Sequence, residues 1–175
     1  MFTYRKANFK DAESIARLHA LSWQQNYRGI FSDNFLDVEV VEDRLSAWRL
    51  RFENSAENQF VHVVVDEDVV VGFVCAYFDK DATYGTLVDN LHVHSDYAGQ
   101  RIGENLLVAV AREIMQNQVK QEMYLWVLAQ NKRAIKFYER AGGNAVETIN
   151  DFDIGDREIT KTRYHWSNLK IFEKN

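Results

Sequence analysis

The residues with the clearest chemical potential lie in one glycine-bearing stretch, residues 91–107. Apolar residues end a predicted strand there, Gly99 and Gly103 bracket a turn, and an apolar stripe at helical spacing begins at Ile102. A helix that begins in this way directs unpaired backbone N–H groups, and the positive end of its dipole, into the turn. The pattern therefore predicts an anion site that suits a phosphate group.

The rest of the chain supplies the elements that must position this turn. Alternating and β-branched patterns predict strands over residues 2–6, 60–65, 69–78, 86–94, 123–128, 144–151 and 158–166. Apolar residues at helical spacing predict helices over residues 11–23, 42–53, 102–119 and 132–141, with Ser32 or Asp33 capping a short additional turn. Because hairpins and βα crossovers are mixed, we expect an α/β (α+β) fold whose mixed sheet carries helices on both faces.

Composition excludes several classes of function. The 175 residues predict one domain, 1–175, and the net charge of −5 argues against broad nucleic-acid binding, which depends on Lys and Arg. No apolar run reaches the length of a membrane span, and the N-terminus does not have the pattern of a signal peptide. A lone cysteine, Cys75, fits a reducing compartment, so we expect a cytoplasmic protein without membrane association.

A second block of residues connects the turn to a known family. Residues 123–146 follow the pattern strand–Asn–x–x–Ala–x–x–Phe–Tyr–x–x–x–Gly at Asn131, Ala134, Phe137, Tyr138 and Gly142. With the turn in the expected order and spacing, the chain resembles the GNAT-type N-acetyltransferases, which transfer an acetyl group from acetyl-CoA to an amine.

The turn itself departs from the family's pattern, which reads Gln/Arg-x-x-Gly-x-Gly/Ala. The aligned residues are Ala98-Gly99-Gln100-Arg101-Ile102-Gly103, so the last glycine matches while Ala98 and Arg101 replace the expected first residue and inner glycine. Residues 21–37 also resemble a subgroup whose first helices read Ser-Trp-x-x-x-Tyr-x-Gly. Arg101 either grips a phosphate or points to solvent.

The resemblance implies a fold and a cosubstrate. The fold is GNAT-like, a mixed, mostly antiparallel sheet of about seven strands in which strands 86–94 and 123–128 splay apart. Acetyl-CoA would bind with its pyrophosphate on the turn and its pantetheine arm along residues 91–93, while Asn131 bonds this arm or caps the following helix. The implied cofactor-binding residues are Leu91, His92, Val93, Ala98, Gly99, Gln100, Arg101, Ile102, Gly103, Glu104, Asn131, Ala134, Phe137 and Tyr138.

Catalysis of acetyl transfer requires an acid and a route for a proton. The resemblance makes Tyr138 the candidate acid, because a phenol near the thioester sulfur can protonate the leaving thiolate. Asp89 and His92 are candidate bases for the acceptor amine, beside His94 and a water chain without a single base. In a regular strand Asp89 shares a face with Leu91, and a bulge would break that relation.

The acceptor itself is less defined by the sequence. In this fold the first helices and last hairpin form the acceptor pocket, so Trp23, Tyr27 and Phe31 are candidate substrate-binding walls, and Asp33 or Asp37 could attract a cationic amine. The alternative interpretation places the aromatic residues in a small core under the helices.

We therefore expect an acetyl-CoA-dependent N-acetyltransferase that acts on a primary amine of a small molecule or peptide. The alternative is a non-catalytic acyl-CoA-binding or sensing domain. A nucleotide-phosphate binder is disfavoured, because the turn does not end in the Gly-Lys-Ser/Thr of a P-loop. No metal is expected, and homodimer formation is left open.

Overall fold

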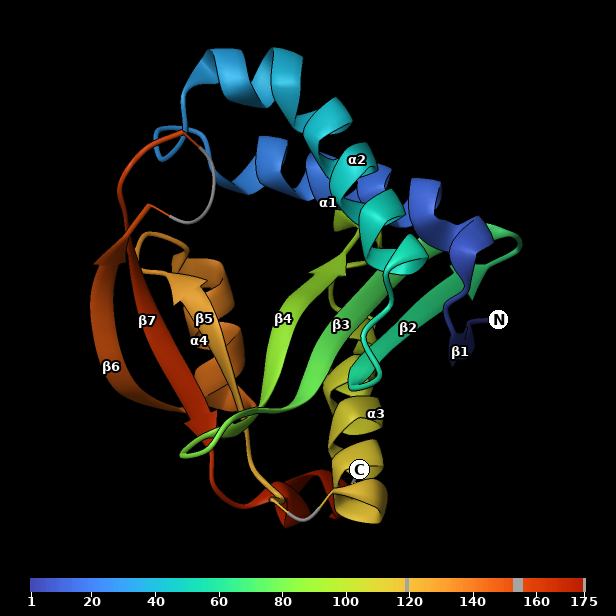
Figure 1. The fold of residues 1–175 in the computed structure, drawn as a ribbon, viewed down its shortest axis with the longest axis vertical. Coiled ribbons are helices and arrows are strands. Elements are labelled where there is room, and N and C mark those ends of the chain that lie inside the picture. The colour runs from blue at the N-terminus through green and yellow to red at the C-terminus, as the bar shows by residue number, and fades with distance from the viewer. Residues whose placement is uncertain (119, 153–155, 175) are drawn as a thin grey trace.

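A single twisted sheet organises the computed structural model, which describes residues 1–118, 120–152 and 156–174 (Figure 1). Its strand order is β1-β2-β3-β4-β5-β7-β6. Only β4 and β5 pair in parallel among the described strands, and the other five pairings are antiparallel. The strands are β1 (Thr3–Lys6), β2 (Gln59–Asp66), β3 (Val69–Asp81), β4 (Gly85–Val93), β5 (Met123–Leu128), β6 (Asn144–Asp151) and β7 (Ile159–Trp166).

Helices cover both faces of the sheet, as the mixed order of elements predicts. On one face lie α1 (Ala12–Asn26) and α2 (Val40–Glu53), whose Ile15 and Trp48 pack on Phe73 of β3 (Figure 1). On the other lie α3 (Ile102–Asn117) and α4 (Lys132–Arg140). The apolar stripe of α3, which includes Leu106 and Ile114, is fully buried there.

These observations confirm the predicted fold class: a mostly antiparallel seven-stranded sheet with helices on both faces and a splayed β4/β5 pair. The continuous apolar run of β5 is almost entirely buried, as a strand between two layers of helices requires. No helix in the described part of the chain is long and apolar enough to span a bilayer.

Several differences from the predicted elements lie near the ends of helices and in the connecting segments. The turn before α2 is a helical segment, Phe35–Glu39, and Ser32 caps it by accepting the Phe35 N–H through Oγ at 3.1 Å. The tail, for which the sequence gives no assignment, contains a short 3-10 helix, Leu169–Lys174. The predicted helix end at Val119 and the centre of the turn at 153–155 lie outside the described residues.

Candidate active site

The candidate site forms where β4 and β5 separate. Their pairing is confined to Thr86 with Met123 and Leu87 with Tyr124, after which the strands diverge (Figure 1). The remainder of β4, residues 88–93, has no strand partner on its β5 side among the described residues. Its backbone polar groups on that side are therefore available to an extended ligand.

A bulge in β4 decides which side chains face this gap. Val88 pairs with Ala76 and Asn90 pairs with Cys75, so Asp89 is the extra residue. The expectation that Asp89 shares a face with Leu91 is therefore wrong in this structure. Leu91 packs toward the α3 side, whereas the Asp89 carboxylate forms an ion pair of 3.0 Å with Arg51 of α2.

A cavity of about 600 Å³ lies on the α3 and α4 side of the gap, and we call it the donor cavity because the family resemblance assigns its lining to acetyl-CoA. It collects almost all of the residues that the family resemblance assigns to acetyl-CoA. Gln100, the remaining predicted residue, is exposed and is not part of the described lining. The predicted residues in the lining are Leu91, His92, Val93, Ala98, Gly99, Arg101, Ile102, Gly103, Glu104, Asn131, Ala134, Phe137 and Tyr138.

The turn before α3 has the backbone geometry that an anion site needs. Gly99 has a φ of +81° and Arg101 a φ of +59°, both in the left-handed region. These conformations turn the chain sharply into α3, whose first residues, Ile102, Gly103 and Glu104, border the cavity. The first N–H groups of a helix have no partner within the helix, so this end of α3 can bind an anion. A Cβ at Gly103 would lie 3.3 Å from Cζ of Phe137, so the glycine permits the close approach of α3 and α4.

Two phenols, those of Tyr27 and Tyr138, line the donor cavity together with Asn131. Asn131 caps α4, because its Oδ1 accepts the Ala134 N–H at 3.1 Å. Burial raises the pKa of Tyr27 to about 12 and raises the pKa of Tyr138, which is 8% exposed. Both phenols therefore keep their protons at neutral pH and can act as hydrogen-bond donors.

On the opposite side of the gap, a second cavity of about 310 Å³ lies under α1 and α2. His92 borders both cavities, and its Nδ1 lies 2.8 Å from Oγ of Ser22. Burial, followed by the charge of Arg44, lowers the pKa of His92 to about 4. Its imidazole is therefore neutral at pH 7 and carries one nitrogen lone pair.

His19 of α1 packs against His92. The two imidazole ring centroids are 4.5 Å apart, and Nδ1 of His19 accepts the indole N–H of Trp48 at 3.0 Å. That bond fixes the proton of neutral His19 on Nε2. Burial lowers the pKa of His19 well below its usual value, so an uncharged histidine pair lines the second cavity.

Comparison with known proteins agrees with this geometry. The model of the acetyltransferase (GNAT) family matches residues 10–143. This chain belongs to the GNAT acetyltransferase family. It is 25% identical over 148 residues to a spermidine N(1)-acetyltransferase of Thermoplasma acidophilum, covering 82% of this chain and 89% of the relative. An uncharacterized N-acetyltransferase of Bacillus subtilis, YuaI, is 25% identical over 175 residues, covering 99% of this chain and 97% of that protein.

Solved structures show the same GNAT fold. The PaiA N-acetyltransferase from Thermoplasma acidophilum, solved in complex with coenzyme A, matches with a TM-score of 0.73 at 19% identity. The match covers 95% of this chain and 99% of that one. A putative GNAT acetyltransferase from Desulfovibrio desulfuricans matches with a TM-score of 0.70 at 15% identity, covering 95% and 98% of the two chains.

Arg101 occupies the position of the GNAT motif's inner glycine and keeps a backbone conformation that favours glycine. Its guanidinium forms two hydrogen bonds of 2.9 Å with the carboxylate of Glu104, one turn into α3. Arg101 therefore places a charged side chain at the rim of the donor cavity while its backbone keeps a left-handed conformation. Arg101 thus borders the donor cavity, while its guanidinium is bound to Glu104.

The predicted acceptor walls divide between the cavity and the core. Trp23 and Tyr27 line the second cavity. Phe31 is 1% exposed and lies behind Trp23, with ring centroids 5.5 Å apart. It therefore supports the wall from the aromatic core, which is the alternative that the sequence left open.

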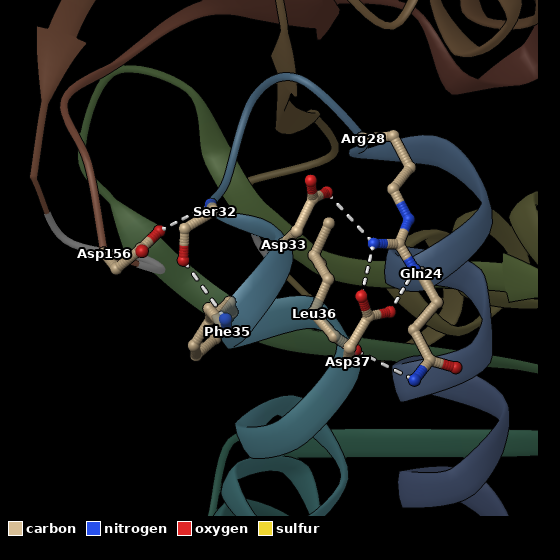
Figure 2. Close-up of polar contacts among 8 residues, drawn as sticks. All are labelled: Gln24, Arg28, Ser32, Asp33, Phe35, Leu36, Asp37 and Asp156. Carbon is tan, nitrogen blue, oxygen red and sulfur yellow. Dashed lines mark hydrogen bonds and ion pairs between the residues drawn. The ribbon is translucent and has the colours of Figure 1, made fainter.

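The acidic residues expected to attract an amine are bound elsewhere. Figure 2 shows Arg28 between Asp33 and Asp37, with 3.1 Å to Oδ1 of Asp33 and 3.0 Å to Oδ2 of Asp37. Gln24 donates to the Leu36 carbonyl at 2.9 Å, which ties the same loop to α1 (Figure 2). These contacts fix the loop that carries the aromatic wall and hold both carboxylates on its outer side.

Sequence reasoning missed the cations of both cavities. Arg133 and Arg140 of α4 border the donor cavity, and their spacing of seven residues on one helical face was the available signal. Arg44, Arg51 and Lys161 border the second cavity. Arg44 and Arg51 have the same seven-residue spacing on α2, whereas Lys161 comes from β7, so no local pattern could have joined all three.

Proposed function

We propose that this GNAT protein transfers an acetyl group from acetyl-CoA to a primary amine of a small molecule or peptide, by direct attack in a ternary complex. The observation that carries the proposal is the meeting of two cavities at the β4/β5 gap. The residues that border both are Tyr27, Val88, Asp89, Asn90, His92 and Trp126. A donor on one side and an acceptor on the other would therefore meet without either leaving its cavity.

The donor cavity fits acetyl-CoA chemically. The N-terminus of α3 and the guanidinium groups of Arg133 and Arg140 offer donors and positive charge to phosphates. The unpaired side of β4 offers backbone groups to the amides of a pantetheine arm, in the manner of an added strand. Gly103 keeps α3 close to Phe137, which closes the apolar end of the cavity.

The reaction would form a nitrogen–carbon bond as the amine attacks the thioester carbonyl, and would break the carbon–sulfur bond. Tyr138 would donate its phenolic proton to the leaving thiolate, for which its raised pKa keeps it protonated. The proton lost by the amine would pass to neutral His92 or to Asp89, both of which border the two cavities. The carboxylate of Asp89 is oriented by Arg51.

A covalent acetyl-enzyme is disfavoured by the environment of Cys75. This cysteine is fully buried in β3, and burial raises the pKa of its thiol to about 12. A thiol that is protonated and inaccessible cannot attack the thioester. The acceptor amine is therefore the nucleophile in this proposal.

The proposal is tested by incubating the purified protein with acetyl-CoA and a panel of primary amines that includes spermidine, the acceptor named for the Thermoplasma relative. Coenzyme A thiol is measured with a chromogenic disulfide, and N-acetylated product by mass spectrometry. We expect equal amounts of thiol and acetylated amine. Tight binding of acetyl-CoA with no product from any amine would favour the acyl-CoA-sensing alternative.

A further inference from the structure

The second cavity has a cationic wall. Arg44 and Arg51 reach it from α2, and Lys161 reaches it from β7. Among the described residues of its lining, Asp89 is the one carboxylate. Of the two histidines in the lining, His19 is buried and His92 is partly buried, and the lowered pKa of each leaves its imidazole neutral at pH 7.

Aromatic rings hold these cations in place. The guanidinium carbon of Arg44 lies 4.6 Å from the centroid of the Trp23 ring, and that of Arg51 lies 4.7 Å from the Trp48 ring. Nζ of Lys161 lies 5.1 Å from the Trp126 ring. Contacts of this kind fix a cationic head group without neutralising its charge.

The carboxylate partners of the cations lie mostly outside the cavity. Arg51 is balanced within the lining by Asp89 at 3.0 Å. Arg44 pairs with its sequence neighbour Asp43 at 2.6 Å, and Lys161 pairs with Asp151 at 2.6 Å. Because Asp43 and Asp151 are not part of the described lining, the surface that meets a ligand is positive. A polyamine would bring further positive charges against this wall.

The position of Arg44 determines how far a negatively charged ligand group could lie from the reacting amine. Arg44 and His92 border the same cavity, and ring contacts connect them. The Arg44 guanidinium lies over Trp23, the His19 ring centroid is 5.0 Å from that of Trp23, and the His92 centroid is 4.5 Å from that of His19. Because His92 also borders the donor cavity, a carboxylate bound by Arg44 would share the second cavity with an amine at the gap. The indoles of Trp23 and Trp126, with Leu128, leave an apolar wall for the rest of the ligand.

We propose that the acceptor is an amine that also carries a carboxylate, of the α-amino acid class, and that Arg44 binds this carboxylate. The inference rests on the proposed acetyltransferase function and names the substrate class of the same site. The observation behind the inference is the positive charge of the cavity wall, whereas the proposed function rests on the meeting of the two cavities.

Matched acceptors test the inference on the unmodified protein. Leucine is compared with isopentylamine, which lacks the carboxylate, and with leucinamide, which retains its shape without the charge; spermidine is the polyamine. Coenzyme A thiol release gives kcat/KM for each. We expect kcat/KM for leucine to exceed that for isopentylamine and for leucinamide by about tenfold or more. Phenylalanine should show the same advantage over phenethylamine and over its own amide.

Substitution of Arg44 tests whether this residue is the source of the preference for acceptors that carry a carboxylate. R44Q is expected to collapse the preference for the amino acid over its decarboxylated partner to within about twofold. The matched control is R49Q, which removes an exposed arginine of the same helix and should retain the preference. Circular dichroism verifies that each variant is folded, and the comparison of acceptors on the unmodified protein stands even where a variant is not.

The outcomes separate the inference from the function on which it rests. Acetylation of leucinamide, isopentylamine or spermidine as efficiently as leucine overturns the carboxylate inference and leaves the acetyltransferase function intact. Retention of the full preference by R44Q overturns the assignment to Arg44. Release of no thiol with any amine would overturn both the function and the inference.

Discussion

The partly buried histidine at the gap, His92, makes the free energy of unfolding depend on pH in a calculable way. Burial and the nearby charge of Arg44 lower the pKa of His92 from 6.5 to about 4. Below pH 6.5 the unfolded chain therefore binds a proton at this residue while the folded protein does not. The free energy of unfolding falls as the pH decreases from about 6.5 to about 4, because protons favour the unfolded state.

The size of the effect follows from the two pKa values. At pH 5 the unfolded histidine is almost fully protonated and the folded one is mainly neutral, so His92 alone lowers the free energy of unfolding by about 2 kcal/mol relative to pH 7.5. His19, whose pKa is also lowered by burial, adds to the decrease in the same direction. The carboxylates with lowered pKa values lose their contribution only at still lower pH.

Urea unfolding at pH 7.5 and pH 5.0, followed by circular dichroism, measures this difference. Between pH 7.5 and pH 5.0, we expect the free energy of unfolding of H92Q to fall by about 2 kcal/mol less than that of the unmodified protein, since Gln does not titrate. H94Q is the matched control, because His94 lies in the following turn and is partly exposed, and its pH dependence should stay near that of the unmodified protein. Identical pH dependence in H92Q and the unmodified protein would refute the neutral, desolvated state of His92.

Three further substitutions test the donor side. Y138F removes the proposed acid and should lower kcat by roughly 100-fold or more, with the affinity for acetyl-CoA measured by calorimetry almost unchanged. G103L places a side chain where a Cβ already lies 3.3 Å from a neighbouring ring, and we expect acetyl-CoA affinity to fall by about tenfold or more. R101G relieves a left-handed backbone conformation and should raise the free energy of unfolding by about 1 kcal/mol, because the exposed Glu104 pair that it removes contributes little.

Each of these substitutions has a contrary result. Unchanged turnover in Y138F would remove the phenol as the acid. Full affinity in G103L, with the fold intact, would place the phosphate site elsewhere. Lower stability in R101G would show that the bond between Arg101 and Glu104 outweighs the backbone strain.

The sequence predicts the local geometry around the donor cavity well, because that geometry arises within short stretches of chain. Two short stretches form this part of the site, the turn before α3 and the block from Asn131 to Tyr138, and each spans fewer than a dozen residues. In each stretch the backbone conformation restricts which residue types fit. Gly99 has the positive φ that its place in the turn predicts, and Asn131 caps α4. Patterns of this kind record local geometry directly.

The acceptor half is poorly predicted, because tertiary packing assembles it. The bulge at Asp89 shifts one side chain to the other face, and nothing in the strand's composition marks it. Arg44 and Lys161 lie more than a hundred residues apart in the sequence and border the same cavity only in the folded protein. Asp33 and Asp37 were plausible by composition, but Arg28 holds them on the outer side of the loop.

The central claim is that amine and thioester react directly at the gap between the two cavities. Initial rates of coenzyme A release, measured while acetyl-CoA and the acceptor amine are varied together, test it most directly. Direct attack in a ternary complex predicts double-reciprocal lines that intersect. Parallel lines, which indicate a covalent acetyl-enzyme formed before the amine reacts, would contradict it.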